Sequence, residues 1–153
     1  MNLWTWLLQH AVTVSYWIVI IAFLTGCLYA YYDGWVDGLH FDRPASLHQI
    51  LPAGPDIHQL FTVRRAIVLI LLSAATGILP AITFGLIFPY VHDGCYYATR
   101  NKLNPQKYPD RWKSEPSRSS TAVMDFSYRI RVFLAFFGVL LIVFSVIVAI
   151  NRG

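Results

Sequence analysis

Charged residues are scarce in this sequence, and three long stretches contain none of them. Asp, Glu, Lys and Arg make up 13% of the 153 residues and hydrophobic types make up 56%, whereas about a quarter of a soluble domain is charged. The stretches 3–32, 66–88 and 132–150 contain no Asp, Glu, Lys or Arg. Because each is close to the roughly 20 apolar residues that cross a bilayer, the sequence excludes a water-soluble globular protein and indicates an integral membrane protein.

Cysteine and N-terminal basic residues are scarce as well. The two cysteines are Cys27 and Cys95, and the predicted spans place them near opposite faces of the membrane, which excludes a disulfide between them within one chain. The first six residues contain no Lys or Arg, and the apolar stretch is longer than that of a cleaved signal peptide. We therefore expect the first span to be retained.

The predicted fold is all-α, with one transmembrane domain covering residues 1–153. Aromatic residues, arginines and a proline mark the ends of three transmembrane helices at about 6–30, 66–88 and 132–150, since aromatic and basic side chains prefer the headgroup layer. The connections 33–65 and 89–131 contain several prolines and glycines. We expect both connections to be irregular, with short interfacial helices.

The distribution of basic residues predicts how the chain is oriented in the membrane. The second connection contains eight Lys and Arg residues and the first contains three. Because Lys and Arg are retained on the cytoplasmic side, the sequence predicts a multi-pass protein of the cell membrane with a cytoplasmic N-terminus and a C-terminus outside. The formal charge of +4 is then a topology signal, and no nucleic-acid partner is expected.

A stripe of small residues is predicted within the second span. It recurs every four positions, which places its members on one face of a helix: Ser73, Gly77, Ala81 and Gly85. In lipid, helices associate through close approach at small residues, so this stripe is a predicted packing face within the chain or against a partner. Pro80 is expected to kink the same helix near the middle of the membrane.

Histidines are the candidate ligands for a cofactor or a metal ion. His10 and His92 both fall near the predicted cytoplasmic boundary, where two imidazoles from different helices can bind a haem. Three histidines of the first connection offer metal donors at spacings that match no compact ligand motif: His40, His48 and His58. Interfacial, hydrogen-bonded histidines are the simpler interpretation, so we expect no cofactor and no metal ion.

The segment after the second span is rich in aromatic and basic residues. Side chains of these types suit the headgroup layer and can hold a lipid phosphate: Tyr96, Tyr97, Arg100 and Lys102. A hydrolase could use His92 as a base and Asp93 as its orienting group, but no nucleophile, second carboxylate or metal triad stands at a useful spacing. The sequence therefore predicts a lipid interface and no catalytic residue.

The same segment carries a resemblance to a group of known proteins. The matching residues are His92 to Tyr97, Thr99 to Pro105, Tyr108, Pro109, Trp112 and Ser119 to Ala122. This pattern resembles one found in small uncharacterised integral membrane proteins of Bacteroidota and their phages. The resemblance implies a bacterial or viral source and a specific role for this segment, and it transfers no site.

The function predicted from these observations is non-enzymatic. The predicted spans contain no Asp, Glu, Lys or Arg, and His10 and Gln9 are their only strongly polar side chains, although charged groups at membrane depth are usual in transporters. We expect an accessory or assembly subunit of a larger membrane complex, in contact with lipid and with other membrane subunits or with copies of itself. Two alternatives are a homo-oligomeric, holin-like pore and a membrane protein that binds a lipid phosphate or a haem.

Overall fold

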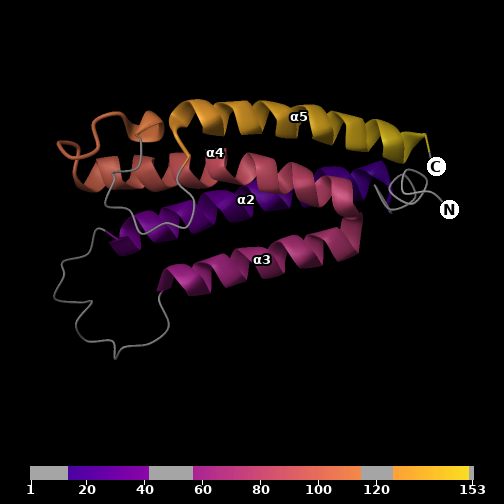
Figure 1. Ribbon diagram of the computed structural model, residues 1–153, viewed down its shortest axis with the longest axis horizontal. Helices are drawn as coiled ribbons and strands as arrows, with labels where there is room; N and C mark the ends of the chain where they lie inside the picture. Colours follow the sequence, from indigo (N-terminus) through magenta and orange to yellow (C-terminus); the bar gives the residue numbers. More distant parts are fainter. Residues whose placement is uncertain (1–13, 42–56, 115–125, 152–153) are drawn as a thin grey trace.

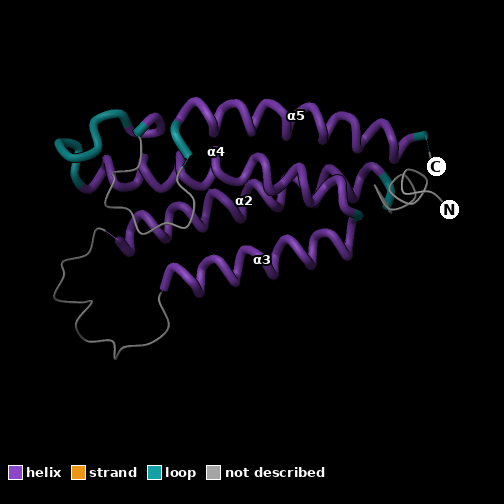
Figure 2. Tube along the Cα trace, in the orientation of Figure 1, coloured by secondary structure: helices purple, strands orange, loops and turns teal. Residues whose placement is uncertain are grey.

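The described part of the chain forms four long helices that lie side by side along one axis. The computed structural model describes residues 14–41, 57–114 and 126–151. The helices are α2 (Tyr16–Phe41), α3 (Ile57–Thr76), α4 (Ile78–Leu103) and α5 (Tyr128–Ile150), and a single 3-10 turn, η2 (Arg111–Lys113), follows α4. Figure 1 shows the helices aligned along the long axis, and Figure 2 shows that the described segments between them are short loops. No strand occurs among the described residues.

The all-α class is confirmed, and three helices are long and apolar enough to cross a membrane. They are Tyr16–Leu39, Ile78–Leu103 and Tyr128–Ile150. Large hydrophobic side chains point outward on the helices instead of into a core, for example Leu28, Ile70 and Phe133, each at least 60% exposed. Such apolar surfaces on several sides are compatible with a multi-pass membrane protein, because lipid replaces water around the helices.

Helix α4 lies at the centre of the bundle. It runs parallel to α2, with Gly26 against the Phe84 ring and Gly34 against the backbone of His92. It runs antiparallel to α5, whose Gly138 lies against Ile87, and to α3, whose Leu69 lies against Gly85. Glycine has no side chain and lets helix backbones approach closely, so these positions fix the register of the bundle.

The predicted second span, 66–88, is wrong as a single helix, because the chain reverses direction within it. Helix α3 ends at Thr76, Gly77 adopts a φ of 101°, and α4 starts at Ile78. A positive φ is accessible to glycine at little cost, and Pro80 lies in the first turn of α4, where a helix needs no N–H donor. The reversal therefore replaces the predicted kink at Pro80.

The predicted stripe of small residues is divided by this reversal. Ser73 lies in α3, Gly77 forms the turn, and Ala81 and Gly85 lie in α4. Ala81 is buried. Gly85 faces Leu69 of α3, since a Cβ added at Gly85 would lie 3.8 Å from Leu69 Cδ2, an ordinary van der Waals distance. The half of the stripe in α4 thus packs within the chain, but the four residues do not form one helix face.

The other helix boundaries also differ from the prediction. Helix α2 continues to Phe41 beyond the predicted end at residue 30, and α4 continues through Pro89 to Leu103. Proline is tolerated within membrane helices because neighbouring groups satisfy the freed backbone. Helix α5 agrees with the predicted span 132–150 apart from one added turn at its start.

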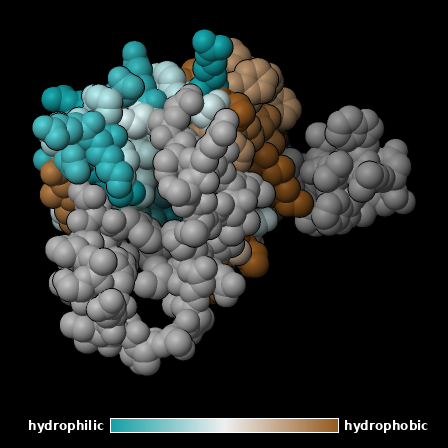
Figure 3. Space-filling model, turned by 60° about the vertical axis from the view of Figure 1, so that its left-hand side comes forward, coloured by the Kyte–Doolittle hydropathy of each residue, from teal (hydrophilic) through white to brown (hydrophobic). Residues whose placement is uncertain are grey.

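The bundle has two chemically different ends. At the Gly77 end, the start of α2 and the end of α5 meet in an apolar contact of Val19 and Ala149, with Leu79 beside them. At the polar end lie the end of α2, the start of α3, the end of α4, η2 and the start of α5 (Figure 1). Figure 3 shows hydrophilic residues gathered at the polar end and hydrophobic surface on the flank of the bundle.

Candidate functional site

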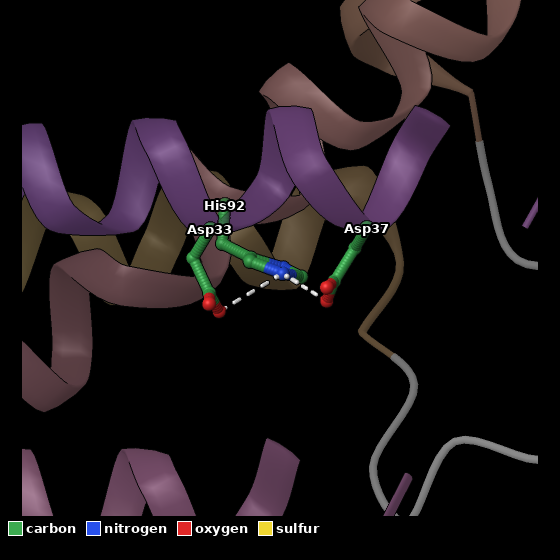
Figure 4. Close-up of side chains that lie close together, drawn as sticks. All are labelled: Asp33, Asp37 and His92. Carbon is green, nitrogen blue, oxygen red and sulfur yellow. Dashed lines mark hydrogen bonds and ion pairs between the residues drawn. The ribbon is translucent and has the colours of Figure 1, made fainter. Parts of the chain in front are cut away.

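Six ionisable side chains from three helices meet inside the bundle. We call them the ionic cluster: Asp33 and Asp37 of α2, Arg64 and Arg65 of α3, and His92 and Asp93 of α4. The i, i+4 spacing of the two α2 carboxylates places them on one face of the helix. Figure 4 shows the His92 ring between these two carboxylates, on the side where α2 faces α4.

Arg65 connects all three helices of the ionic cluster. Its Nε donates to Asp33 Oδ2 at 2.9 Å, and its Nη2 donates to Asp37 Oδ2 at 2.7 Å and lies 2.7 Å from His92 Nε2. Arg64 donates a further hydrogen bond to Asp33 Oδ1. The two arginines of α3 therefore tie this helix to α2 and α4.

His92 has two different hydrogen-bonding environments, one at each ring nitrogen. Nδ1 lies 2.8 Å from Asp93 Oδ1, whose acceptor character holds a proton on that nitrogen. Nε2 lies 2.7 Å from the Arg65 donor and 3.1 Å from the acceptor Asp37 Oδ2. A neutral ring accepts from Arg65 through Nε2, whereas a protonated ring donates to Asp37, so its charge decides which contact forms.

Aromatic rings enclose the histidine along α4. Phe88 stacks on the His92 ring with centroids 5.0 Å apart, and Tyr96 stacks on its other side at 6.4 Å. The Arg65 guanidinium lies 5.2 Å from the centre of the Phe88 ring. The i, i+4 spacing of these three α4 residues accounts for the stack, which keeps the imidazole plane in position for Arg65 and Asp37.

The ionic cluster lies along the apolar length of the bundle, nearer to the polar end. His92 is about 21 Å along α4 from Ile78, and Tyr97, which packs against Arg131, is about 28 Å from it at 1.5 Å per residue. The apolar part of α5 begins directly after Arg131. The cluster therefore lies roughly 7 Å along the bundle from the level of Arg131, on the side of the Gly77 end.

The carboxylates of the ionic cluster outnumber its guanidinium groups by one among the described residues. Asp33, Asp37 and His92 are 1%, 3% and 7% exposed, and Asp37 Oδ1 has no hydrogen-bond partner. The described members of the cluster include three carboxylates and two guanidinium groups, so with a neutral His92 their net charge is −1, and with a protonated His92 it is zero.

The same region contains the one group that could hold a metal ion among the described residues. Asp33, Asp37 and His92 each offer a ligand atom, and these atoms lie within 4.8 Å of one another. The Arg65 guanidinium contacts all three side chains and already supplies a positive charge at this position. The geometry therefore favours a protein cation, with the arginine in the role that a metal ion would otherwise have.

Several predicted ligand residues cannot be compared with the structure. His10 and His48, and the side chains of His40 and His58, lie outside the described residues. His92 is described, and it lies in the continuous helix α4 rather than in an irregular segment after Pro89. Its described neighbours are the members of the ionic cluster and two aromatic rings.

The predicted lipid-facing residues lie in different environments. Tyr97 is buried beside Arg131 and Tyr108, and half-buried Tyr96 packs on His92. Arg100 donates to the Tyr96 hydroxyl and lies 4.4 Å from the centre of the Tyr108 ring. Lys102 is exposed. The structure thus places the tyrosines and Arg100 in contacts within the chain and leaves Lys102 on the surface.

Sequence reasoning missed Asp33, Asp37, Arg64 and Arg65 as members of one site. Gly34 and Gly38 were interpreted as turn residues of an irregular connection, which removed the two carboxylates from the first span. Both glycines instead mark close approach, since an added Cβ at Gly38 would lie 2.9 Å from the Tyr96 carbonyl oxygen. The signal available in the sequence was the i, i+4 spacing of Asp33 with Asp37 and of Gly34 with Gly38. This spacing indicates that the helix of the first span continues through these residues.

Comparison of the chain with protein-family models, with curated proteins and with solved structures gave no match.

Proposed function

We propose that the protein is a non-enzymatic, multi-pass membrane subunit whose helix α3 is held by the ionic cluster in a protonation-dependent way. The position of His92 Nε2, between a donor on Arg65 and an acceptor on Asp37, carries the proposal. Ionisable groups at membrane depth are costly and mark proton or ion sites. The predicted spans contain no Asp, Glu, Lys or Arg, which favoured a passive role, but charged residues beyond their predicted ends pair between the helices.

The charge on His92 changes the attraction between α3 and the rest of the bundle. Arg64 and Arg65 give α3 two positive charges in the cluster, and they face the carboxylates of Asp33 and Asp37. Protonation of His92 places a positive charge 2.7 Å from Arg65 and removes the hydrogen bond between them. Helix α3 is then held less tightly.

A proton can reach His92 from the polar end. The side chain of Asp93, the Nδ1 partner of His92, is 27% exposed, whereas Asp33 and Asp37 are buried. On the other side of His92, Phe88 and Phe84 fill the space toward the Gly77 end. This arrangement suits a site that binds a proton from one side of the membrane and favours a sensing role over conduction by one chain.

Helix α3 is suited to transmit this change to a partner. It packs against α2 and α4, and its outward face carries exposed apolar side chains, including Ile67, Ile70 and Leu71. A neighbouring membrane subunit, or a second copy of the chain, would pack on such a face through small and apolar contacts. We propose that acidification shifts α3 and thereby changes that association.

The proposal predicts that α3 moves away from the bundle on acidification. Spin labels would be placed on Ile70→Cys of α3 and Val143→Cys of α5, both exposed, after Cys27 and Cys95 are replaced by alanine. Histidine changes charge between about pH 8 and about pH 5. Over this range we expect the label distance to increase by about 1–2 Å, the usual size of a helix shift, in a double electron–electron resonance measurement.

Two controls make this measurement specific. Labels on Leu28→Cys of α2 and Val143→Cys of α5 report on helices outside α3, and their distance should stay constant with pH. His92→Gln retains polar contacts without the charge and should abolish the shift of the α3 label. A shift that persists in His92→Gln, or no shift at all in the parent, would contradict the proposal.

We also propose an orientation that differs from the prediction at the start of the first described helix. Nine described basic residues lie toward the polar end and none toward the Gly77 end: Arg64, Arg65, Arg100, Lys102, Lys107, Arg111, Lys113, Arg129 and Arg131. By the positive-inside rule the polar end is cytoplasmic. The start of α2 and the end of α5 share the Gly77 end, so both of these helix ends are then on the outer side.

Labelling of single cysteines in intact cells tests this orientation. In a chain without its native cysteines, a membrane-impermeant maleimide should modify Ser15→Cys and Asn151→Cys, which are exposed and lie on the outer side in the proposed orientation. Lys107→Cys at the polar end should react only after the cells are permeabilised. Protection of Ser15→Cys together with labelling of Asn151→Cys would instead support opposite sides for the start of α2 and the end of α5.

A further inference from the structure

Arg131 is a buried cation without a carboxylate partner in the described structure. Its residue exposure is 0%, and it is the largest of the fully buried side chains. Nη2 donates to the backbone oxygen of Ser114 at 2.7 Å. Nε and Nη1 have no hydrogen-bond partner, and neither has the Ser114 hydroxyl. Two of the three guanidinium nitrogens are therefore unsatisfied, although arginine remains charged at any physiological pH.

The described surroundings of Arg131 contain aromatic rings but no negatively charged group. The guanidinium carbon lies 5.4 Å from the centre of the Tyr97 ring and 5.7 Å from that of Tyr128, and these faces offer only a weak negative potential. A buried charge without a counter-ion is strongly unfavourable. The cost disappears when an anion accepts the free N–H groups, so the site is complete only with a negatively charged ligand.

We propose that Arg131 and Ser114 bind a phosphate group at the polar end of the bundle. Guanidinium donors match the oxygens of phosphate in geometry and charge, and the Ser114 hydroxyl adds a donor beside them. Arg131 directly precedes the apolar part of α5, which is the level of lipid headgroups. A phospholipid headgroup and a free phosphate share this chemistry and are the two sources to be distinguished.

The charge of the polar end supports this assignment. Exposed basic side chains close to the site in sequence, such as Arg111 and Lys113, raise the local concentration of anions. The phosphate contact expected from the sequence at Arg100 and Lys102 lies elsewhere, since Arg100 contacts Tyr96 and Tyr108 and Lys102 is exposed. The site at Arg131 is also separate from the ionic cluster, so its test is independent of the protonation proposal.

Ligand binding would be measured on the delipidated full-length protein by native mass spectrometry in a mild detergent. One titration uses inorganic phosphate and a second uses phosphatidylglycerol, with uncharged diacylglycerol as the comparison. We expect stoichiometric binding of at least one phosphate source and none of diacylglycerol. Binding of phosphatidylglycerol alone identifies a lipid site, and binding of both identifies a site for the phosphate group itself.

Variants of the two arginines at the start of α5 locate the site. Arg131→Gln should weaken binding at least tenfold, whereas the exposed Arg129→Gln, which removes the same charge, should change it less than twofold. Arg131→Lys keeps the charge without the planar donor set and serves if Arg131→Gln does not fold. The parent should also melt at a higher temperature when the ligand is added. Equal binding in the parent and Arg131→Lys, or no binding of either phosphate source, would overturn the proposal.

Discussion

Asp33→Asn is expected to lower the free energy of unfolding by about 3 kcal/mol, the lower end of the loss when one partner of a buried ion pair is removed. Asp33 is 1% exposed and pairs with both Arg64 and Arg65. The substitution leaves the two guanidinium groups with one buried carboxylate between them. The lower end applies because both arginines retain some exposure. Equilibrium unfolding in mixed detergent micelles measures the effect.

Asp93→Asn is the matched control for Asp33→Asn. It removes the same charge from the ionic cluster, but Asp93 is partly exposed and its described contact is with His92 alone. We expect a loss of about 1 kcal/mol, the usual net value of one hydrogen bond. Combining Asp33→Asn with Arg64→Gln should cost less than the sum of the two single changes, because the residues interact directly. Equal losses for Asp33→Asn and Asp93→Asn would show that the pairing with α3 is unimportant.

Gly34→Ala is expected to destabilise the bundle by about 3 kcal/mol, the upper end of the usual cost of overpacking. A Cβ at this position would lie 2.1 Å from the carbonyl oxygen of His92. That oxygen belongs to the backbone of α4 and cannot be moved by changing a rotamer. The two helices must therefore separate at the ionic cluster, which weakens the contacts of Asp33 and Asp37 as well. The same unfolding measurement tests this prediction.

Gly85→Ala provides a control at another helix interface. The nearest atom to an added Cβ there is Leu69 Cδ2 at 3.8 Å, an ordinary van der Waals distance. Because alanine also has the higher helix propensity, we expect Gly85→Ala to be neutral or slightly stabilising. If Gly34→Ala were equally well tolerated, the close approach of α2 and α4 at His92 would be incorrect.

Local sequence patterns predicted the class of the fold but not its turns. The end of helix α5 was predicted correctly and its start to within about one turn, since its apolar run is bounded by basic residues and by Asn151. The run 66–88 is equally apolar, yet it contains a reversal at Gly77. Hydropathy cannot distinguish one long helix from two short halves joined by a turn, because the residues on both sides of the turn face lipid or protein and are apolar in either case.

The candidate site was the least predictable part of the protein. His92 and Asp93 were recognised as a pair, and the structure brings them together at 2.8 Å. Their partners in α2 and α3 are 55 and 27 residues from His92 in the chain. No local pattern relates residues so far apart in the chain. Only the packing of α4 against α2 explains Gly34 and Gly38, since an added Cβ at either position would meet the backbone of α4.

The sequence by itself determined that the chain is helical, apolar and able to cross a membrane, because these properties depend on residue type and on spacing within one helix. Tertiary structure alone decided that α3 and α4 form a hairpin, that α2 and α4 run in parallel, and that three carboxylates, two arginines and a histidine share one site between the helices. These features depend on which helix faces pack together. Contacts between residues far apart in the chain determine that packing, together with the pairing of charges that an apolar environment cannot solvate.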